Sequence, residues 1–370
     1  MAWLRDWFTL GKNTIESVTP DQVTSLYALE WPETRKMLIA DQQAAIEQEP
    51  SRLKRWLRTV SAIFFGLATR LAPHRRILFV FAQVAFFVCL FSIFTRMSDP
   101  PLWAFVELAV AFLLMTLLLA MELIDKIKIR DELVLARELQ ASLIPKTPPQ
   151  SPSYDIAAFN HIANTVGGDI YDFVPLADGR LAILFGDASG HGMAAGLVMA
   201  VAHAAFRTQL DVDASPASIT SSLNRILCRT GGPRSFFSSC YVLLSPNGEF
   251  VATLAGHPPI VKMDANGKVV ERITRGAYPL GVKEGLVWEE LSGTLAPGER
   301  LLLHSDGLTE ARNVNDREFG DDFVDTIAGW DSTASAESLV DTLVAEWKFF
   351  TAGMTPEDDV SLAVIARRAL

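Results

Sequence analysis

Two long apolar runs constrain this chain more than any other feature of its sequence. The first runs from Ile77 to Phe94 and holds no charged residue, and the second runs from Pro101 to Met121 with Glu107 as its only charge. A helix that spans a bilayer needs about 20 apolar residues. Because the link between the runs is short, we predict an antiparallel transmembrane hairpin with helices at 77–95 and 101–121. A buried helical pair in a soluble protein is the alternative.

Basic residues flank the predicted hairpin on one side of the membrane. Three arginines lie within residues 70–76 and three basic residues within 126–130, whereas the link between the helices holds only Arg96. Positively charged flanks stay in the cytoplasm. The sequence therefore predicts a multi-pass protein of the inner (cytoplasmic) membrane, with both termini and the C-terminal half in the cytoplasm.

Residues 1–76 are predicted to be a mostly helical cytoplasmic segment, whose role the sequence does not reveal. Pro20, Pro32 and Pro50 divide them into short pieces. Segment 51–72 is basic at its start and apolar later. Two alternatives fit this segment equally well. It could lie on an anionic membrane surface, or it could pack on the rest of the N-terminal region.

Residues 122–153 continue out of the second apolar run as an amphipathic helix and a linker. Leucines and one isoleucine recur between the charges, at Leu123, Ile127, Leu133, Leu139 and Leu143. This pattern is typical of an amphipathic helix, here a signalling helix, and a parallel homodimer through residues 122–143 is one way to cover its apolar side. The proline-rich segment 144–153 ends the helix.

Charge separates the two halves of the chain. Residues 1–142 hold 16 Lys and Arg against 15 Asp and Glu, whereas residues 143–370 hold 17 against 28. An acidic half argues against a nucleic-acid partner, whose binding surface would be basic. It suits a domain that gathers carboxylates around cations. The three cysteines, Cys89, Cys228 and Cys240, have neither the spacing of a metal site nor the number of a disulfide framework.

From residue 154 onward, short apolar runs and turn signals alternate with longer helical patterns. Strands are expected at 155–160, 181–189, 301–306 and from 359, and helices at 192–210, 215–230 and 334–350. Asn-Gly steps at 247–248 and 266–267 predict two hairpins. This mixture indicates an α+β domain with antiparallel sheets over residues 154–370.

Four acidic positions in this domain lie at strand ends or tight turns. Asp169 follows two glycines in VGGDIYD, Asp187 lies in FGDASGHG, Asp306 lies in HSDGLTE, and Asp358 and Asp359 precede a strand in PEDDVSLAV. Carboxylates at strand ends can meet at one edge of a sheet. Mg²⁺ and Mn²⁺ prefer such oxygen ligands, so the pattern favours a metal site.

The ordered series VGGDIYD, GDASGHGMAA, AGHPP, YPLG, SDGLTE and DDVSLAV resembles the metal-dependent protein phosphatases (PPM, type 2C), and among them the bacterial SpoIIE-like branch. The resemblance covers about residues 133–368. It implies two packed antiparallel β-sheets flanked by helices, with two Mn²⁺ or Mg²⁺ ions at one end. It also implies hydrolysis of phosphoserine or phosphothreonine on a protein, such as a component of a sigma-factor antagonist system.

The resemblance assigns the metal ligands position by position. Asp169 matches the first metal-site aspartate, and Asp187 matches the aspartate that bridges the two ions and acts in catalysis. Ala188 stands where the family uses a backbone carbonyl. Asp306 matches the third acidic ligand and Asp358 the last, with the neighbouring Asp359 as the alternative.

Two histidines and a rival function complete the expectations. His191 in SGHG is a candidate proton donor to the leaving group, at a place where relatives often have Lys. His257 in AGHPP is expected to be structural. The alternative function is a catalytically silent, membrane-bound phosphatase-like sensor or scaffold, although all four acidic positions are present.

Overall fold

The computed structural model describes residues 31–95 and 102–368, apart from residues 164, 233–234, 321, 323, 325, 327–334, 353 and 355. The helices predicted before residue 31 and the link between the two apolar runs lie outside the described residues. The chain divides into two compact units, Met1–Lys128 and Ile129–Leu370.

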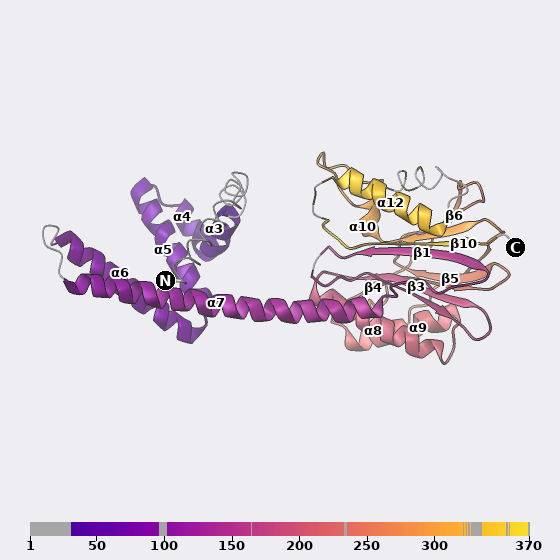
Figure 1. The fold of residues 1–370 in the computed structure, drawn as a ribbon, viewed down its shortest axis with the longest axis horizontal. Coiled ribbons are helices and arrows are strands. Elements are labelled where there is room, and N and C mark those ends of the chain that lie inside the picture. Colours follow the sequence, from indigo (N-terminus) through magenta and orange to yellow (C-terminus); the bar gives the residue numbers. More distant parts are fainter. Residues whose placement is uncertain are drawn as a thin grey trace, which may run out of the picture. The chain divides into compact units, whose positions relative to one another are not determined.

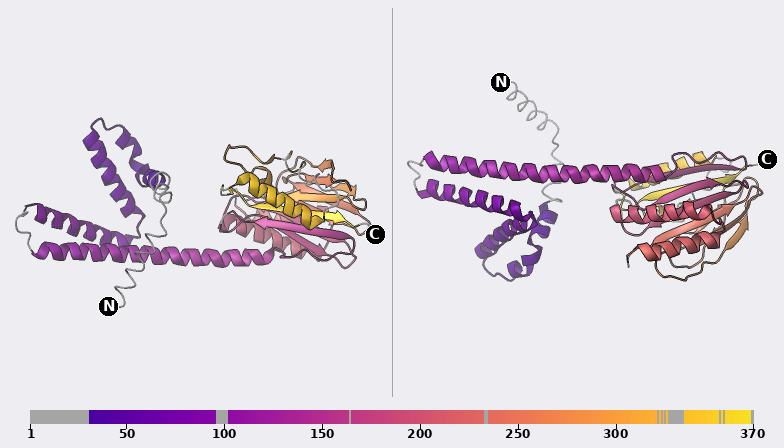
Figure 2. Two further views of the ribbon diagram at one scale, coloured as in Figure 1. Left: turned by 45° about the horizontal axis from the view of Figure 1, so that its top comes forward. Right: turned by 90° about the horizontal axis from the view of Figure 1, so that it is seen from below.

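Helices make up the described part of the first unit (Figures 1 and 2). They are α3 (Trp31–Ile39), the 3₁₀ helix η2 (Ala40–Gln42), α4 (Gln43–Glu47), α5 (Arg52–Arg70), α6 (Pro73–Thr95) and α7 (Leu102–Leu143), the last of which continues into the second unit. Pro73 occupies the first position of α6, where its missing N–H costs nothing.

Helix α6 and the first part of α7 run side by side (Figures 1 and 2). Both are long and apolar enough to cross a membrane, by length and composition alone. Their large side chains face outward: Phe91 is 69% exposed and Phe112 is 73% exposed. The guanidinium of Arg75 joins the two helices, with ion pairs of 2.8 Å to Glu122 and 2.6 Å to Asp125. The predicted pair of apolar helices is therefore present before the acidic half.

The second unit contains two antiparallel five-stranded sheets. Their strand orders are β1-β10-β9-β6-β7 and β2-β3-β4-β5-β8. The strands are β1 (Tyr154–His161), β2 (Ile170–Pro175), β3 (Leu181–Ala188), β4 (Phe237–Leu244), β5 (Glu249–Ala255), β6 (Ile260–Met263), β7 (Val269–Ile273), β8 (Leu291–Thr294), β9 (Arg300–His304) and β10 (Val360–Arg367). The helices are α8 (Met193–Leu210), α9 (Pro216–Thr230), α10 (Asp306–Thr309) and α12 (Ala336–Thr351).

The second unit is layered as helix, sheet, sheet and helix. Helix α12 packs on β1 and β10, while α8 and α9 cover β3, β4 and β5 (Figure 1). Strand β10 shows how the layers are filled, because Leu362 and Val364 pack toward α12 whereas Ala363 and Ile365 enter the core between the sheets. Burial on both faces explains why such strands read as continuous apolar runs. The predicted fold of two packed antiparallel sheets flanked by helices is confirmed.

Local predictions agree with the structure at most positions. Both Asn-Gly hairpins are present, as β4–β5 and β6–β7, and their glycines have φ values of 91° at Gly248 and 78° at Gly267. Two details differ. Strand β9 ends at His304, so Asp306 begins the short helix α10 instead of ending the strand. The short strand β8 carries no clear pattern in the sequence.

Candidate metal centre

Strand pairing brings the acidic positions together in pairs. Asp169 comes directly before β2 and Asp187 lies near the end of β3, and the register Ile170↔Gly186 places these two strand ends side by side. On the other sheet, Asp306 follows β9 and Asp358 precedes β10. The register Leu362↔His304 places the end of β9 beside the start of β10. Antiparallel pairing always sets the start of one strand against the end of its neighbour.

Asp359 connects the two sheets at this edge. Its Oδ1 accepts a hydrogen bond from the backbone N–H of Ala163 at 2.8 Å, and its Oδ2 accepts one from Gly168 at 2.6 Å. The side chain is only 5% exposed. A carboxylate that accepts two backbone N–H groups holds a loop firmly. Asp359 therefore fixes the loop that leads into Asp169.

The carboxylates at this edge raise one another's pKa. Burial and the charge of Asp187 hold the pKa of Asp169 well above its usual range. Burial, followed by the charges of Asp306 and Asp358, raises the pKa of Asp187 to about 8. Burial also raises the pKa of Asp358, against a hydrogen bond from the backbone N–H of Asp359. Like charges in a poorly hydrated place favour the neutral acid unless a cation is present.

The residues present fit a hard divalent cation. Oδ2 of Asp169 is buried and has no hydrogen-bond partner in the described part of the chain. A methyl group added at Gly168 would lie 2.7 Å from both the carbonyl oxygen of Ala188 and Oδ1 of Asp187. Only glycine leaves this space between oxygen atoms open. Carboxylate and carbonyl oxygens are the donor set that Mg²⁺ and Mn²⁺ prefer.

The acidic side chains are neighbours, but they do not form a ready-made ligand cage. Among the described residues, no three His, Cys, Asp or Glu side chains are grouped closely enough to hold an ion as they stand. Burial, together with repulsion between the carboxylates, raises the pKa of Asp187 and of Asp358, and both effects oppose such a grouping of charges in the protein alone.

Two adjacent carboxylates, Asp358 and Asp359, have different surroundings. Asp359 is buried and bonded to the loop, whereas Asp358 is exposed. The charge of Asp358 contributes to the raised pKa of Asp187, and the charge of Asp306 contributes to that of Asp358. His191 lies near Asp358, where its imidazole partly opposes the rise in the pKa of Asp358 that burial causes. These surroundings suit a ligand at Asp358 and a loop anchor at Asp359.

The two candidate histidines also differ in their exposure to solvent. His191 is exposed and lies between Gly190 and Gly192, whose φ values of 90° and 69° turn the chain sharply before α8. His257 is only 8% exposed, and burial lowers its pKa to about 4, so the ring is neutral. Its Nδ1 lies 3.0 Å from the carbonyl oxygen of Pro258. These surroundings agree with the structural role expected for His257.

Comparison with known proteins decides the family. The family model described as Stage II sporulation protein E (SpoIIE) matches residues 177–368, more than half of the chain. The chain belongs to the SpoIIE family. The resemblance read from the ordered motifs is thereby confirmed.

Three relatives of this SpoIIE-family chain are informative. Phosphoserine phosphatase RsbU of Bacillus subtilis is 25% identical over 189 residues, which cover 51% of this chain and 56% of RsbU. Phosphoserine phosphatase RsbP of the same organism is 24% identical over 190 residues, covering 50% of this chain and 47% of RsbP. The chain thus spans about half the length of these curated relatives. The SiaA-PP2C domain of Pseudomonas aeruginosa shares the fold, with a TM-score of 0.58 and 19% identity over 66% of this chain and 99% of that domain.

A cavity of about 520 Å³ opens beside Asp358 in this SpoIIE-family domain. Gly307 and Asp358 line it, together with Trp347 and Thr351 of α12. Pockets of 300–1,000 Å³ are typical of ligand sites. The cavity can therefore receive a side chain that approaches the carboxylates.

Gln140 is a functional candidate that the sequence analysis did not identify. It lies near the end of α7 and is only 4% exposed. Its Nε2 donates to the carbonyl oxygen of Gly167 at 2.7 Å, and its Oε1 accepts from the N–H of Gly167 at 3.0 Å. The end of α7 is thereby bonded to the loop that carries Asp169. Nothing in the sequence distinguished Gln140 from the other polar residues of that helix.

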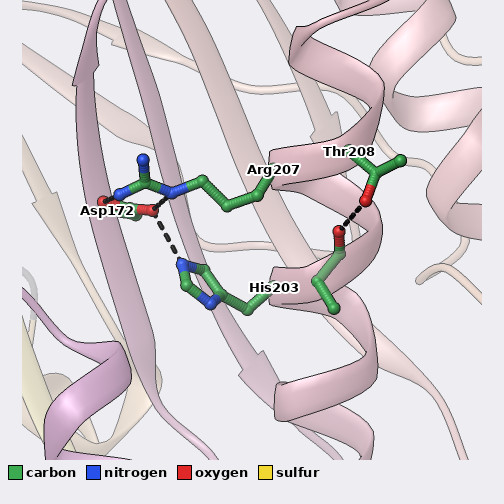
Figure 3. A network of polar contacts seen from close by, with 5 residues as sticks. Asp172, His203, Arg207 and Thr208 are labelled. Atoms are coloured by element: carbon green, nitrogen blue, oxygen red, sulfur yellow. Dashed lines mark hydrogen bonds and ion pairs between the residues drawn. The ribbon is translucent and has the colours of Figure 1, made fainter.

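A second overlooked cluster fixes α8 on β2 (Figure 3). Asp172 is fully buried, and its Oδ2 lies 2.7 Å from Nε2 of His203 and 2.6 Å from Nε of Arg207. Against the effect of burial, these hydrogen bonds lower the pKa of Asp172. The i, i+4 spacing of His203 and Arg207 was a usable signal, since it places both on one helix face.

Proposed function

We propose that this SpoIIE-family chain is a metal-dependent phosphatase that hydrolyses phosphoserine or phosphothreonine on a protein substrate. The observation that supports the proposal is the strand pairing that sets Asp169 beside Asp187 at the end of one sheet and Asp306 beside Asp358 at the end of the other. The relatives RsbU and RsbP are both named phosphoserine phosphatases, and this activity is of the same class as the one proposed.

Five residues would hold the ions. In this proposal the carboxylates of Asp169, Asp187, Asp306 and Asp358 and the carbonyl oxygen of Ala188 would hold two Mn²⁺ or Mg²⁺ ions. When bound, such ions lower the pKa of a water molecule and stabilise negative charge on phosphoryl oxygens. They would also neutralise the repulsion that raises the pKa of Asp187.

The protein's own groups position the reaction. Asp359 holds the loop before Asp169 through the N–H groups of Ala163 and Gly168. The imidazole of His191, exposed and near Asp358, would give its proton to the departing serine or threonine oxygen. The cavity beside Asp358 would receive the phosphorylated side chain.

The segment before the phosphatase domain would anchor and regulate it. We propose that residues 77–121 form a transmembrane hairpin in the inner membrane, with residues 1–76, the linker 122–153 and the phosphatase domain 154–370 in the cytoplasm. Exposed apolar side chains on α7, such as Ile127 and Leu139, support a homodimer through residues 122–143. A signalling regulator, such as a member of a sigma-factor antagonist system, is the proposed substrate.

Hydrolysis of an aryl phosphate by the full chain in detergent, with and without manganese, tests the activity. Asp187→Asn and Asp306→Asn should each abolish manganese-dependent turnover while the thermal melting transition is kept. Asp178→Asn is the matched control, since Asp178 is exposed and pairs only with Arg180 among the described residues.

Two outcomes would contradict the proposal. Near wild-type turnover of Asp187→Asn with manganese would remove that residue from the mechanism. Manganese binding to the wild type by calorimetry without any hydrolysis of phosphorylated peptides would favour the catalytically silent alternative.

A further inference from the structure

Helix α5 carries an apolar stripe whose first part, up to Leu57, is covered by none of the described helices. The stripe consists of residues spaced three and four apart: Leu53, Trp56, Leu57, Val60, Phe64 and Leu67. This spacing places all of them on one face of a helix. Leu53 is 67% exposed, Trp56 is 61% exposed and Leu57 is 52% exposed. Large apolar side chains gathered on one outward face mark an interaction surface.

A different face of α5 holds the helix in place. Ala62 is buried with Ile39 and Ile46, and Gly66 lies so close to the carbonyl group of Leu38 that a methyl group would collide with it. The guanidinium of Arg70 donates to the carbonyl oxygen of Met37 at 2.6 Å. Since the helix is already held by these contacts, the stripe is not needed for packing on α3 and α4.

The charge of α5 indicates the partner. Residues 52–70 contain five basic residues and no acidic one, and four of the five fall in the first two turns: Arg52, Lys54, Arg55 and Arg58. A helix with an apolar face and a basic start fits an anionic lipid surface, because cations near the headgroups are attracted to the negative lipids.

The stripe is also continuous with α6. Arg76 of α6 donates to the carbonyl oxygens of Thr69 at 2.7 Å and Leu71 at 2.9 Å, which fixes the corner between the helices. The rings of Phe64 and Phe79 lie 6.5 Å apart across this corner. A bilayer that receives α6 would therefore meet the stripe of α5 at its surface.

We propose that α5 lies in the headgroup layer of a bilayer that contains anionic phospholipid, with its apolar stripe facing the lipid. This inference rests on the proposed insertion of α6 into the membrane. The sequence alone left two alternatives for this segment, and the separate packing face of α5 favours the membrane surface.

Fluorescence quenching of a single NBD label on the full chain in nanodiscs tests the proposal. The background is Cys228→Ser, because Cys89 and Cys240 are buried. The label is placed at Leu57→Cys on the stripe, at Thr69→Cys on the side facing away from it, and at Phe91→Cys on the outward face of α6. Lipids that carry a nitroxide just below the headgroup should quench the Leu57 label several-fold more than the Thr69 label. Adding phosphatidylglycerol to zwitterionic lipid should strengthen this quenching, and Arg52→Gln with Lys54→Gln should cancel the gain.

The other occupants of the stripe give different results. Equal lipid quenching at the two α5 positions, with strong quenching at Phe91, would overturn the α5 proposal alone. A Leu57 label shielded from both lipid and aqueous iodide, and exposed to iodide after deletion of residues 1–30, would assign the stripe to that segment and overturn it. Self-quenching that grows with the number of chains per disc, without lipid quenching, would assign it to a second copy. Absence of lipid quenching at Phe91 would overturn membrane insertion and the α5 proposal together, while leaving the phosphatase assay unaffected.

Discussion

Replacement of Gln140 should weaken metal binding at the proposed site around Asp169, although Gln140 is not one of the proposed ligands. Gln140 makes two hydrogen bonds to the backbone of Gly167, and all of these groups are buried. Gln140→Ala would leave the N–H and the carbonyl oxygen of Gly167 without partners. Each buried polar group left unpaired costs about 1–3 kcal/mol. For the two groups we therefore expect a total cost of about 2–6 kcal/mol, shared between global stability and the order of the loop.

The share that falls on the loop sets the effect on the metal. Gly168 stays bonded to Asp359 after the change, so the loop keeps part of its order. If about 1–2 kcal/mol of the cost falls on the loop, the apparent affinity for Mn²⁺ should drop about fivefold to thirtyfold, because 1.4 kcal/mol corresponds to about a factor of ten. Titration calorimetry with Mn²⁺ and urea unfolding in EDTA measure the two shares separately.

Two variants control this experiment. Gln140→Met keeps the length of the side chain without its polar atoms, so it should behave like Gln140→Ala. Ser142→Ala lies on the same helix, is exposed, and loses only a local bond to the carbonyl oxygen of Leu139. It should leave both measurements unchanged. Wild-type Mn²⁺ affinity together with a wild-type unfolding midpoint for Gln140→Ala would refute the reasoning.

Three further predictions concern the carboxylates. In EDTA, the stability that comes from keeping Asp187 neutral is complete below its unfolded pKa of about 3.9 and is lost as the pH rises through about 8. Asp187→Asn should therefore stabilise the metal-free chain near pH 8, as measured by urea unfolding. The lowered pKa of Asp172 contributes stability above about pH 3.9 that is lost as the pH falls through the folded pKa. Asp172→Asn should therefore cost about 1.5–3 kcal/mol at pH 7, the range for hydrogen bonds to a charged group, and should flatten the acid limb of thermal melts. Asp358→Asn should lower Mn²⁺ affinity in calorimetry more than tenfold, that is by at least about 1.4 kcal/mol, whereas Asp359→Asn should mainly lower the melting temperature, and the reverse pattern would make Asp359 the ligand.

Features with a local code were predictable from the sequence. Asn-Gly steps at 247–248 and 266–267 identified two hairpins because the turn type demands a residue with positive φ. The strands around Leu362 and Ile183 were visible as apolar runs. The ordered acidic motifs indicated a shared edge, which antiparallel registers at Ile170↔Gly186 and Leu362↔His304 then produce.

Features that depend on tertiary contacts were not predictable. Asp358 and Asp359 are chemically identical neighbours, and only the position of the backbone N–H groups of Ala163 and Gly168 distinguishes them. Gln140 bonds to a glycine 27 positions away, which no periodicity encodes. Strand β8 was missed because its pairing with β5 depends on Gly293, whose lack of a side chain leaves room for the ring of Phe250.

The place of β10 in its sheet has a consequence for synthesis of the protein. Among the strands that the structure describes, β10 is the last in chain order, yet it pairs between β1 and β9. Until residues 360–367 have left the ribosome, β1 and β9 each keep an open edge, and the carboxylates before β10 are missing from the acidic edge. Because chains are made from the N-terminus, α6 and α7 emerge long before that moment. A nascent chain would therefore carry an unfinished sheet until β10 is added, and the acidic edge would be completed only then.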